Sequence, residues 1–547
     1  MHPRSPYAKK RPDFDKLAKL YPKQLGPHVT EQSNGRVLID FQNGDACRAL
    51  TQVLLLHDFG IHAPQAADRL CPPLRRFMQV PNRLNYVLWV QDLLAASLQS
   101  GTTGTSPPTA LCDVPTHSSA AIESEHRSKR QRIENDKPSG HPEGSVHILD
   151  IGTGASGIYP LLGCALDDRW TFTATDIDGE SLRLAQKIVD APENESKRLK
   201  NRILYLFRKK SDSLLPLDHA EGTGASERAL LYYATMCNPP FYASTDEMKE
   251  SAEAKVENPS AACTGTEIEM ITQGGEVAFV TRMIRESLAP EAREKIVWLS
   301  SMLGKISSVS AVVKELQSNR IDNYALAEFV QGRTRRWAIA WSHQAYRLPD
   351  SVARNVGPSL RTHAPPSNSV FKTFEQNPLG HNPRSLLGKL AELLRGTAQV
   401  TELCGSEPAE RSSDQKDEGE NTERVLLDAS FSVDTWSRAA RRARERASKE
   451  GQSAQPVPTS TAPILCLRCE SAYQGAYGTS HGEVPTQNSS ERSIWSETEP
   501  ERPLQPTSVF VSITWTYGHS RADFAACSNS LLRRLETLIP SVNNTQA

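Results

Sequence analysis

The segment VHILDIGTGASG, residues 146–157, decides how this chain folds. The run before its first glycine is mostly apolar and has the length of a buried β-strand, and a helical pattern follows its last glycine. Gly152, Gly154 and Gly157 permit a tight turn and let the backbone approach a ligand. Free N–H groups at the start of the next helix can then receive polar ligand atoms. This order predicts the ligand-binding edge of a doubly wound sheet.

Further strand-like segments alternate with helical patterns between Val146 and His343. They read TFTATDID, ILYLF, YYATMCNPPF, KIVWLSSM and RWAIAWS. Alternation of this kind predicts a mostly parallel sheet with helices on both faces. We therefore expect a Rossmann-like α/β core over residues 143–345.

The predicted strand in the segment TFTATDID ends with a candidate ligand-binding carboxylate, Asp176. It follows the glycine turn by about 20 residues, the position from which a carboxylate bonds both hydroxyls of an adenosine ribose. The alternative is that Asp176 only caps the next helix. Together, the turn and Asp176 predict a cofactor that contains adenosine, and a dinucleotide oxidoreductase would share both features.

The sequence CNPPFY, residues 237–242, separates these possibilities. Two prolines cannot sit in a paired strand, so Pro239 and Pro240 predict a rigid corner at the ligand-binding edge. There, the Asn238 side chain and the Pro239 carbonyl can accept both N–H groups of an exocyclic amine and aim its lone pair at a methyl sulfonium. Phe241 would stack on a flipped-out base. A simple turn that ends the strand is the alternative.

Several motifs together resemble the methyltransferase-like protein 16 family, the U6 small nuclear RNA adenine-N6 methyltransferases. They read RPDFDKLAKLYP, VPNRLNYVLWVQDLL, DIGTGASGIYPLLG, CNPPF, GGEVAFVTRMIRES, SSMLGK and EFVQGRTRRWAIAWS. The likeness covers residues 7–343, and bacterial ribosomal-RNA adenine-N6 enzymes share several of the motifs. It implies a class I methyltransferase fold, S-adenosylmethionine as methyl donor, and an adenine in structured RNA, above all U6 small nuclear RNA, as acceptor.

The resemblance also implies which residues form the site. The expected S-adenosylmethionine contacts are Arg83, Gly152, Gly154, Ser156, Asp176 and Asn238, and the expected adenine contacts are Asn238, Pro239, Pro240 and Phe241. A Lys-Thr loop gates the cofactor pocket in the family, and its nearest match here is Lys209-Lys210-Ser211, which adds Ser211 to the expected cofactor contacts. The family commonly has glutamate where this chain has Asp176.

Basic clusters predict where RNA binds. The net charge is only -1, from 63 Lys and Arg against 64 Asp and Glu, so affinity for a polyanion must come from local clusters. Two clusters lie in the resembling region and consist of Lys9, Lys10 and Arg11, and of Arg333, Arg335 and Arg336 beside Trp337. The Arg-rich stretch 436–446 predicts a helix that grips duplex phosphates. Ordinary solvated charge is the alternative for each.

Composition divides the 547 residues into five segments, since one hydrophobic core rarely serves so long a chain. These are a basic N-terminal RNA-binding module of the methyltransferase domain (1–98), a disordered insertion (99–142), the Rossmann-like methyltransferase core (143–345), a linker (346–383), and a smaller α+β C-terminal domain that is interrupted by disordered insertions and expected to bind RNA (384–547). The run Lys129–Arg132 in the first insertion is either a nuclear import signal or solvated charge.

Other classes of protein are disfavoured. The 10 cysteines are scattered and no apolar leader begins the chain, so a secreted disulfide framework is not expected. No apolar run reaches about 18 residues, so we expect no membrane span. The CxxC pair Cys466 and Cys469 lacks a second ligand pair, so we expect no metal. We expect a nuclear protein that can also occur in the cytoplasm; its oligomeric state stays open.

Two alternative functions also stay open. An Asn-Pro-Pro-aromatic corner also serves enzymes that methylate guanine N2 or protein glutamine, because both substrates present a planar amine or amide. The chain could instead be an RNA-binding factor whose catalysis is dispensable. The basic clusters favour RNA over protein as the substrate, since a glutamine-methylating enzyme needs no phosphate contacts.

Overall fold

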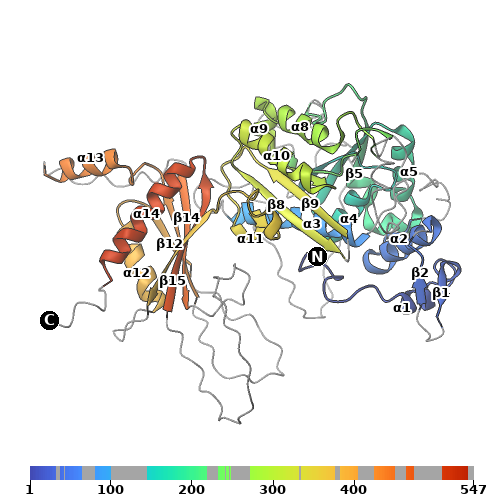
Figure 1. Cartoon of the computed structure of the whole chain (residues 1–547), viewed down its shortest axis with the longest axis horizontal. Coiled ribbons are helices and arrows are strands. Elements are labelled where there is room, and N and C mark those ends of the chain that lie inside the picture. Colours follow the sequence, from blue (N-terminus) through green and yellow to red (C-terminus); the bar gives the residue numbers. More distant parts are fainter. Residues whose placement is uncertain are drawn as a thin grey trace, which may run out of the picture. The chain divides into compact units, whose positions relative to one another are not determined.

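The computed structural model describes residues 1–32, 37–41, 43–63, 80–99, 145–217, 232–240, 242–245, 247, 271–331, 334–375, 382–403, 424–449, 463–473 and 508–539. These residues form two compact units (Figure 1). The first unit comprises the described residues up to Gln344 together with 351–366, and the second comprises 345–350 and the described residues from Ser367 onward.

An eight-stranded sheet forms the centre of the first unit, in the order β10-β8-β9-β7-β6-β3-β4-β5. Its strands are β3 (Val146–Ile151), β4 (Trp170–Asp176), β5 (Ile203–Phe207), β6 (Tyr232–Cys237), β7 (Ile296–Leu303), β8 (Tyr324–Gln331), β9 (Thr334–Trp341) and β10 (Arg354–Asn355). From β7 to β5 the strands are parallel, whereas β9 runs antiparallel to both of its neighbours. The chain moves outward from β3 to β5 and then returns to β6 on the other side of β3. The strand order therefore reverses between β3 and β6, where doubly wound sheets bind ligands.

Helices cover this sheet, which confirms the predicted doubly wound α/β core. They are α3 (Val80–Gln99), α4 (Ile158–Leu166), α5 (Gly179–Val189), α8 (Gly275–Glu286), α9 (Pro290–Lys295) and α10 (Ile306–Ser318). Helix α3 packs against α4, and α8 packs against α10. Every residue of β3 is buried, as expected for a central strand that is covered on both faces.

The N-terminal part belongs to the same unit as this sheet. It contains α1 (Phe14–Leu20), β1 (Val29–Glu31), β2 (Val37–Ile39) and α2 (Gly44–Phe59). Helix α2 begins at Asn43, whose side chain accepts the N–H groups of Asp45 and Ala46, and it ends at Gly60 in the left-handed conformation. Its buried side chains recur at helical spacing and face α3 and α4.

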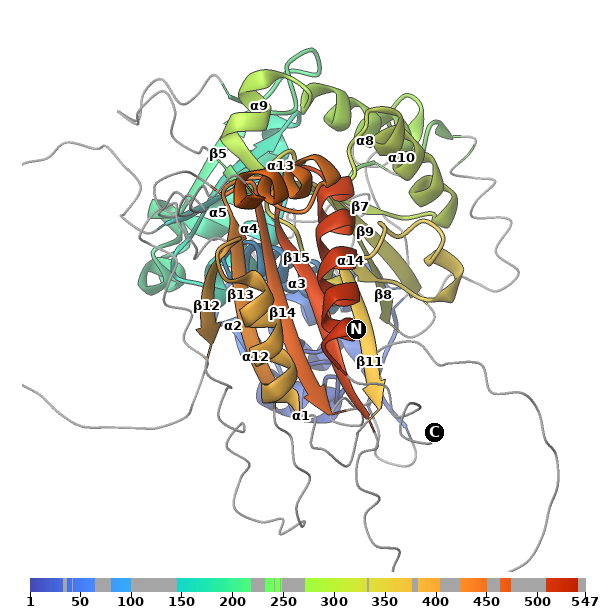
Figure 2. The same ribbon diagram turned by 90° about the vertical axis from the view of Figure 1, so that its left-hand side faces the viewer.

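The second unit is a five-stranded antiparallel sheet in the order β11-β15-β14-β13-β12. Its strands are β11 (Ser369–Glu375), β12 (Gln399–Leu403), β13 (Arg424–Phe431), β14 (Leu465–Tyr473) and β15 (Ser508–Gly518), and its helices are α12 (Pro383–Leu394), α13 (Arg438–Lys449) and α14 (Arg521–Thr537). Helices α12 and α14 lie side by side on the sheet (Figure 2). Alternate β15 residues from Val509 to Trp515 are fully buried and join the core beneath these helices.

The segment 346–383, expected to be a linker, contains regular structure. It contains α11 (Asp350–Ala353), β10 and a short 3-10 helix (Pro358–Leu360). Residues 351–366 of this stretch belong to the first unit. Strand β11 is an edge strand of the second sheet and pairs with β15. Its partner lies far along the chain, with Ser369 opposite Thr514, so the local sequence carries little sign of the pairing. The predicted insertion lies outside the described residues from position 100 to 142.

Candidate active site

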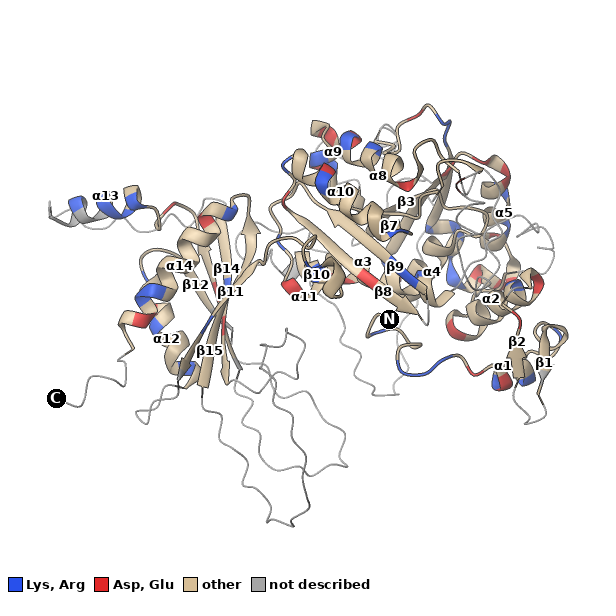
Figure 3. Ribbon diagram, in the orientation of Figure 1, with Lys and Arg blue, Asp and Glu red and all other residues tan. Residues whose placement is uncertain are grey.

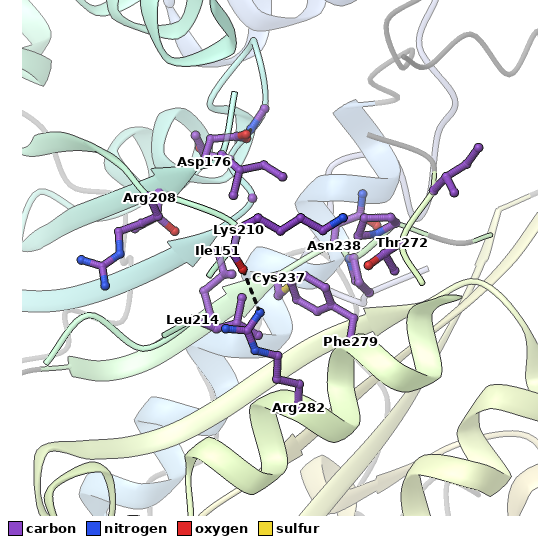
Figure 4. Close-up of a pocket in the computed structure, with 18 of the residues that line it drawn as sticks. Ile151, Asp176, Arg208, Lys210, Leu214, Cys237, Asn238, Thr272, Phe279 and Arg282 are labelled. Atoms are coloured by element: carbon purple, nitrogen blue, oxygen red, sulfur yellow. Dashed lines mark hydrogen bonds between the residues drawn. The ribbon is translucent and has the colours of Figure 1, made fainter. Parts of the chain in front are cut away.

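A cavity of about 970 Å³ lies at the carboxyl ends of β3, β4 and β6 (Figure 4). The parts of the first unit that line it include the glycine turn after β3, the end of β4, the loop after β5, the Asn-Pro-Pro corner after β6, and α8 with the residues just before it. Because the strand order reverses here, the cavity lies where the glycine turn and the corner were expected to meet.

The Thr175 carbonyl and the Asp176 carboxylate hold the glycine turn in place. The N–H groups of Gly152 and Thr153 both donate to the Thr175 carbonyl at 2.9 Å. The Gly154 N–H donates to Asp176 Oδ2 at 2.8 Å. Gly152 and Gly154 have φ values of 73° and 67°, so the turn needs glycine at both positions. A Cβ on either would meet nothing within 4 Å, which leaves open space beside the turn.

The Asp176 carboxylate lines the cavity and ties the turn to β4. Its Oδ1 accepts the N–H of Asp178 at 2.9 Å, while its Oδ2 holds Gly154. The cap of α5 is Asp178, whose side chain accepts the Glu180 N–H. Asp176 is therefore not the helix cap, so the capping alternative does not explain it.

Asn238, Pro239 and Pro240 all line the cavity. The Oδ1 atom of Asn238 is buried and has no hydrogen-bond partner among the described residues. A buried amide oxygen without a partner is costly, so an N–H donor from a ligand would be favoured there. Phe241 lies outside the described residues.

Ser156 presents a second unpartnered acceptor at the cavity. Its hydroxyl is buried with no hydrogen-bond partner in the described part of the chain, and the residue lines the cavity beside Gly154. A hydroxyl both donates and accepts, so it can meet a polar ligand atom of either kind. The structure thus places Gly152, Gly154, Ser156, Asp176 and Asn238 around one space.

Two other expected cofactor contacts lie elsewhere. Arg83 is 9% exposed and does not line the cavity; its Nη1 donates to the Tyr159 hydroxyl at 3.2 Å. Ser211 is exposed and also lies outside the lining, although its neighbours Lys209 and Lys210 line it. The family resemblance implied both contacts, and both stay predictions about the cofactor-bound protein.

Helix α8 supplies a pair of charged residues that the sequence analysis missed. Arg282 lines the cavity, and its guanidinium donates to the carbonyls of Lys210 at 3.5 Å and Asp212 at 2.5 Å. Glu286, one turn further on, bonds Arg282 Nε at 2.7 Å and accepts the Leu214 N–H at 2.7 Å. The pair therefore fastens the loop after β5 to α8. Figure 4 shows the Lys210 side chain extending from this loop toward Asn238.

Asp150 is fully buried directly behind the glycine turn. Its carboxylate makes no hydrogen bond of ordinary geometry to the described residues. Burial raises its pKa from 3.8 to about 7, and the nearby Asp176 adds to this effect, whereas Thr153 and Arg83 oppose it. The ionised form of Asp150 therefore destabilises the fold near neutral pH.

This burial predicts a pH-dependent effect of Asp150→Asn on stability. Between pH 3.8 and about 7, Asp150 is protonated in the folded state and ionised in the unfolded state. The wild-type chain therefore loses stability over this range as the pH rises, and the loss is complete above about pH 7. We expect the ligand-free variant to match the wild type near pH 4 and to melt several degrees higher at pH 8.

Thermal unfolding monitored from pH 4 to 8.5 tests this prediction. Asp168→Asn is the control, because its carboxylate is fully exposed. A melting difference for Asp150→Asn that does not change with pH would refute the buried-charge explanation.

The predicted RNA-binding residues are mostly on the surface. Lys9, Lys10 and Arg11 are exposed. In the hairpin formed by β8 and β9, Arg335 is exposed and bonds Glu328 at 3.0 Å. Arg336 is partly exposed, and Arg333 lies outside the described residues. In the second unit, the sequence of α13 is rich in arginine, and Figure 3 colours these positions of its ribbon blue.

The described residues show no sign of a metal site or a membrane span. Within those ranges, no group of three or more His, Cys, Asp or Glu side chains is placed to hold a metal ion. No helix of the described part combines the length and apolar character that a membrane span requires.

Comparisons with known proteins identify relatives of the first unit. The model of an RNA methyltransferase family matches residues 1–122 and 130–345. The RNA N(6)-adenosine-methyltransferase mettl16 of Danio rerio is 34% identical over 346 residues, which are 62% of this chain and 59% of that protein. The U6 small nuclear RNA (adenine-(43)-N(6))-methyltransferase of Schizosaccharomyces pombe is 32% identical over 409 residues, which are 75% of this chain and 83% of that protein.

A solved structure is also similar in sequence. The human METTL16 catalytic domain in complex with a MAT2A 3′UTR hairpin is 33% identical, with a TM-score of 0.47, and the match covers 63% of this chain and 95% of that one. The chain spans between 50% and 59% of the length of the fish, mouse and human relatives.

Proposed function

Since the chain belongs to the RNA methyltransferase family, we propose that it transfers a methyl group from S-adenosylmethionine to the exocyclic N6 of an adenine in structured RNA. The acceptor we propose first is U6 small nuclear RNA, for which the Schizosaccharomyces pombe relative is named. An acceptor of this kind would place the enzyme in nuclear RNA processing.

The observation that carries the proposal is the unpartnered Oδ1 of Asn238 at the cavity. An adenine amine donates poorly to an electrophile, because its lone pair is delocalised into the ring. Acceptance of its two N–H groups by Asn238 Oδ1 and the Pro239 carbonyl would localise the lone pair and orient it. Pro239 and Pro240 keep both acceptors in place because proline fixes its own backbone.

The residues on the other side of the cavity fit the cofactor. S-adenosylmethionine supplies, when bound, a methyl group made electrophilic by a positively charged sulfur. The Asp176 carboxylate at the cavity can accept ribose hydroxyls, and the open space beside Gly152 and Gly154 lets the backbone approach the ligand. The Ser156 hydroxyl offers a further polar contact. These features agree with an adenosine-containing donor.

RNA as the acceptor is supported by the exposed cations of the first unit. Lys9, Lys10 and Arg11 lie together at the surface, and Arg335 and Arg336 lie on a strand whose Trp337 is buried. Such groups bind phosphates, which a protein substrate lacks. We propose that the Arg-rich helix α13 adds contacts to duplex RNA from the second unit.

The acceptor class can be tested directly. Purified chain is incubated with S-adenosylmethionine labelled in the methyl group, together with total RNA and total protein. We expect the label in ribonuclease-sensitive material and strong labelling of a U6 transcript. Label only in protease-sensitive material would overturn the proposal in favour of a glutamine-type acceptor.

Neutralising the first basic cluster should weaken RNA binding in a salt-dependent way. Each phosphate contact contributes about 0.7 to 0.9 to the slope of log K against log salt. The triple variant Lys9→Ala, Lys10→Ala, Arg11→Ala should therefore reduce the slope by about 2 to 3. Fluorescence anisotropy with a hairpin RNA at several salt concentrations measures it.

A matched control removes three other surface cations. Arg183→Ala, Lys187→Ala and Lys200→Ala change the net charge equally on and near α5, where Arg183 pairs with Glu180 and Lys200 with Asp190. Equal slopes for the two triple variants would contradict a specific role for Lys9, Lys10 and Arg11.

A further inference from the structure

The last residues of β6, just before Asn238, are held by side chains from α3 and β7. Tyr86 of α3 is fully buried, and its hydroxyl lies 2.7 Å from Ser300 Oγ of β7. The Cys237 N–H donates to the same Tyr86 oxygen at 3.3 Å. Ser300 is bonded to Thr235, two residues before Cys237. A polar chain therefore links α3 and β7 to the strand that ends at the corner.

The donors and acceptors in this series of hydrogen bonds can be assigned in only one way. Ser300 Oγ lies 2.5 Å from the Thr235 carbonyl, which can only accept, so the Ser300 hydroxyl donates there. Tyr86 must then donate its proton to Ser300, and the lone pair of the Tyr86 oxygen accepts the Cys237 N–H. Burial raises the pKa of Tyr86 well above its usual value, so the hydroxyl keeps its proton.

The contact falls where the strand pairing between β6 and β7 gives way. The pairing joins Tyr232 to Ile296 and Ala234 to Trp298, and side chains make the later connections. Pro239 and Pro240 have no N–H, so Cys237 and Asn238 carry the last backbone donors before the corner. A hydrogen bond to the Cys237 N–H can therefore fix the orientation of the backbone that leads into Asn238.

Tyr86 itself is held rigidly but does not line the cavity. Its ring packs edge-on against Tyr159, with centroids 5.3 Å apart, and stacks with Trp89. Aromatic packing of this kind restricts the position of the hydroxyl. Tyr86 can thus act on the reaction only through the residues that it contacts.

We propose that Tyr86 is a positioning residue for methyl transfer, which holds the Cys237 N–H and thereby sets the direction in which Asn238 meets the substrate amine. The inference rests on the proposed function, because it concerns the same corner. Ser300 completes the arrangement by accepting the hydrogen bond of the Tyr86 hydroxyl. The glycine turn and Asp176 lie outside this chain of contacts, so the cofactor should bind independently of Tyr86.

The variant Tyr86→Phe tests the role, since it keeps the ring and removes the hydroxyl. A small displacement of a reacting group can cost about 100-fold in rate, so we expect kcat to fall about 10- to 100-fold. The KM for RNA and the Kd for S-adenosylmethionine should stay near the wild-type values. Ser300→Ala should lower kcat in the same way, and the double variant should lose little more than either single one.

Tyr324→Phe is the matched control. Tyr324 is 4% exposed, lies in the same unit, and donates its hydroxyl to the His363 carbonyl at 3.1 Å. Its loss should reduce thermal stability about as much as Tyr86→Phe and leave kcat unchanged. Hydrogen exchange of the Cys237 amide should be faster in Tyr86→Phe and unchanged in Tyr324→Phe.

These readouts separate the two claims. An active wild type together with Tyr86→Phe at wild-type kcat would overturn the positioning role. A wild type that transfers no methyl group would refute the proposed function. Hydrogen exchange of the Cys237 amide would still show whether Tyr86 holds that N–H. Unchanged exchange of that amide in Tyr86→Phe would overturn the inference in either case.

Discussion

Asn238→Ala lowers kcat for methyl transfer to RNA by about 100- to 1000-fold, the range seen when one preorganised polar group is removed from an active site. The variant removes the side-chain oxygen that is unpartnered at the cavity and leaves both prolines of the corner in place. Asn238 is also one of the expected cofactor contacts, but Asp176 and the glycine turn are untouched, so the Kd for S-adenosylmethionine should rise by a much smaller factor than kcat falls. Single-turnover methylation of a hairpin RNA and calorimetric titration of the cofactor measure the two quantities.

Asn319→Ala is the control for this variant. Asn319 caps the end of α10 and donates its side-chain amide to the Glu315 carbonyl at 2.8 Å. Its loss should cost a little stability and leave kcat as it is. Asn238→Ala with near-normal kcat would show that the corner does not orient the amine.

Asp176→Ala weakens cofactor binding, the second large effect that we expect. The substitution removes the acceptor of the Gly154 N–H and the carboxylate that faces the cavity. A hydrogen bond to a charged group contributes about 1.5 to 3 kcal/mol, so the Kd for S-adenosylmethionine should rise roughly 10- to 200-fold. Asp176→Glu keeps the carboxylate and should recover most of the affinity. Calorimetric titration of ligand-free protein measures this.

Asp178→Ala provides a matched carboxylate control two residues away. Asp178 accepts the Glu180 N–H and the Ser181 hydroxyl at the start of α5. Loss of such a cap costs about 1 kcal/mol of stability and should leave the cofactor affinity unchanged. An equal loss of affinity in Asp176→Ala and Asp178→Ala would mean that only the local fold is being disturbed.

Local patterns were sufficient to predict the core of the first unit. The glycine turn needs positive φ values at Gly152 and Gly154, and only a few residue types tolerate them, so the sequence signal is strong. The Asn-Pro-Pro corner is similar, because Pro239 and Pro240 exclude a paired strand. In both places the residue type and the backbone conformation are closely linked, so the local sequence predicts the conformation.

Other parts depend on contacts between distant segments. Strand β11 pairs with β15 across more than a hundred residues, and its flanks of proline and serine suggested a linker. The family resemblance implied a cofactor contact for Arg83, and in the structure its side chain donates to the Tyr159 hydroxyl. The direction of a side chain on α3 depends on how that helix packs, which spacing along the chain does not reveal.

The missed residues had weak or shared signals. Arg282 and Glu286 are one helical turn apart, a spacing that usually marks a surface ion pair and gives no reason to expect a contact with the loop after β5. Tyr86 belongs to a run of apolar and aromatic residues on α3, so it was indistinguishable from core. Its hydroxyl acquires a role only when β6 and β7 are brought beside it.

The identity of the methylated nucleoside tests the central claim most directly. RNA labelled by the wild-type chain is digested to nucleosides and analysed by mass spectrometry, beside RNA treated with Asn238→Ala. The proposed geometry predicts N6-methyladenosine as the labelled product, nearly absent with the variant. Label in N2-methylguanosine, or equal labelling by both proteins, would contradict the claim that Asn238 and Pro239 orient an adenine amine.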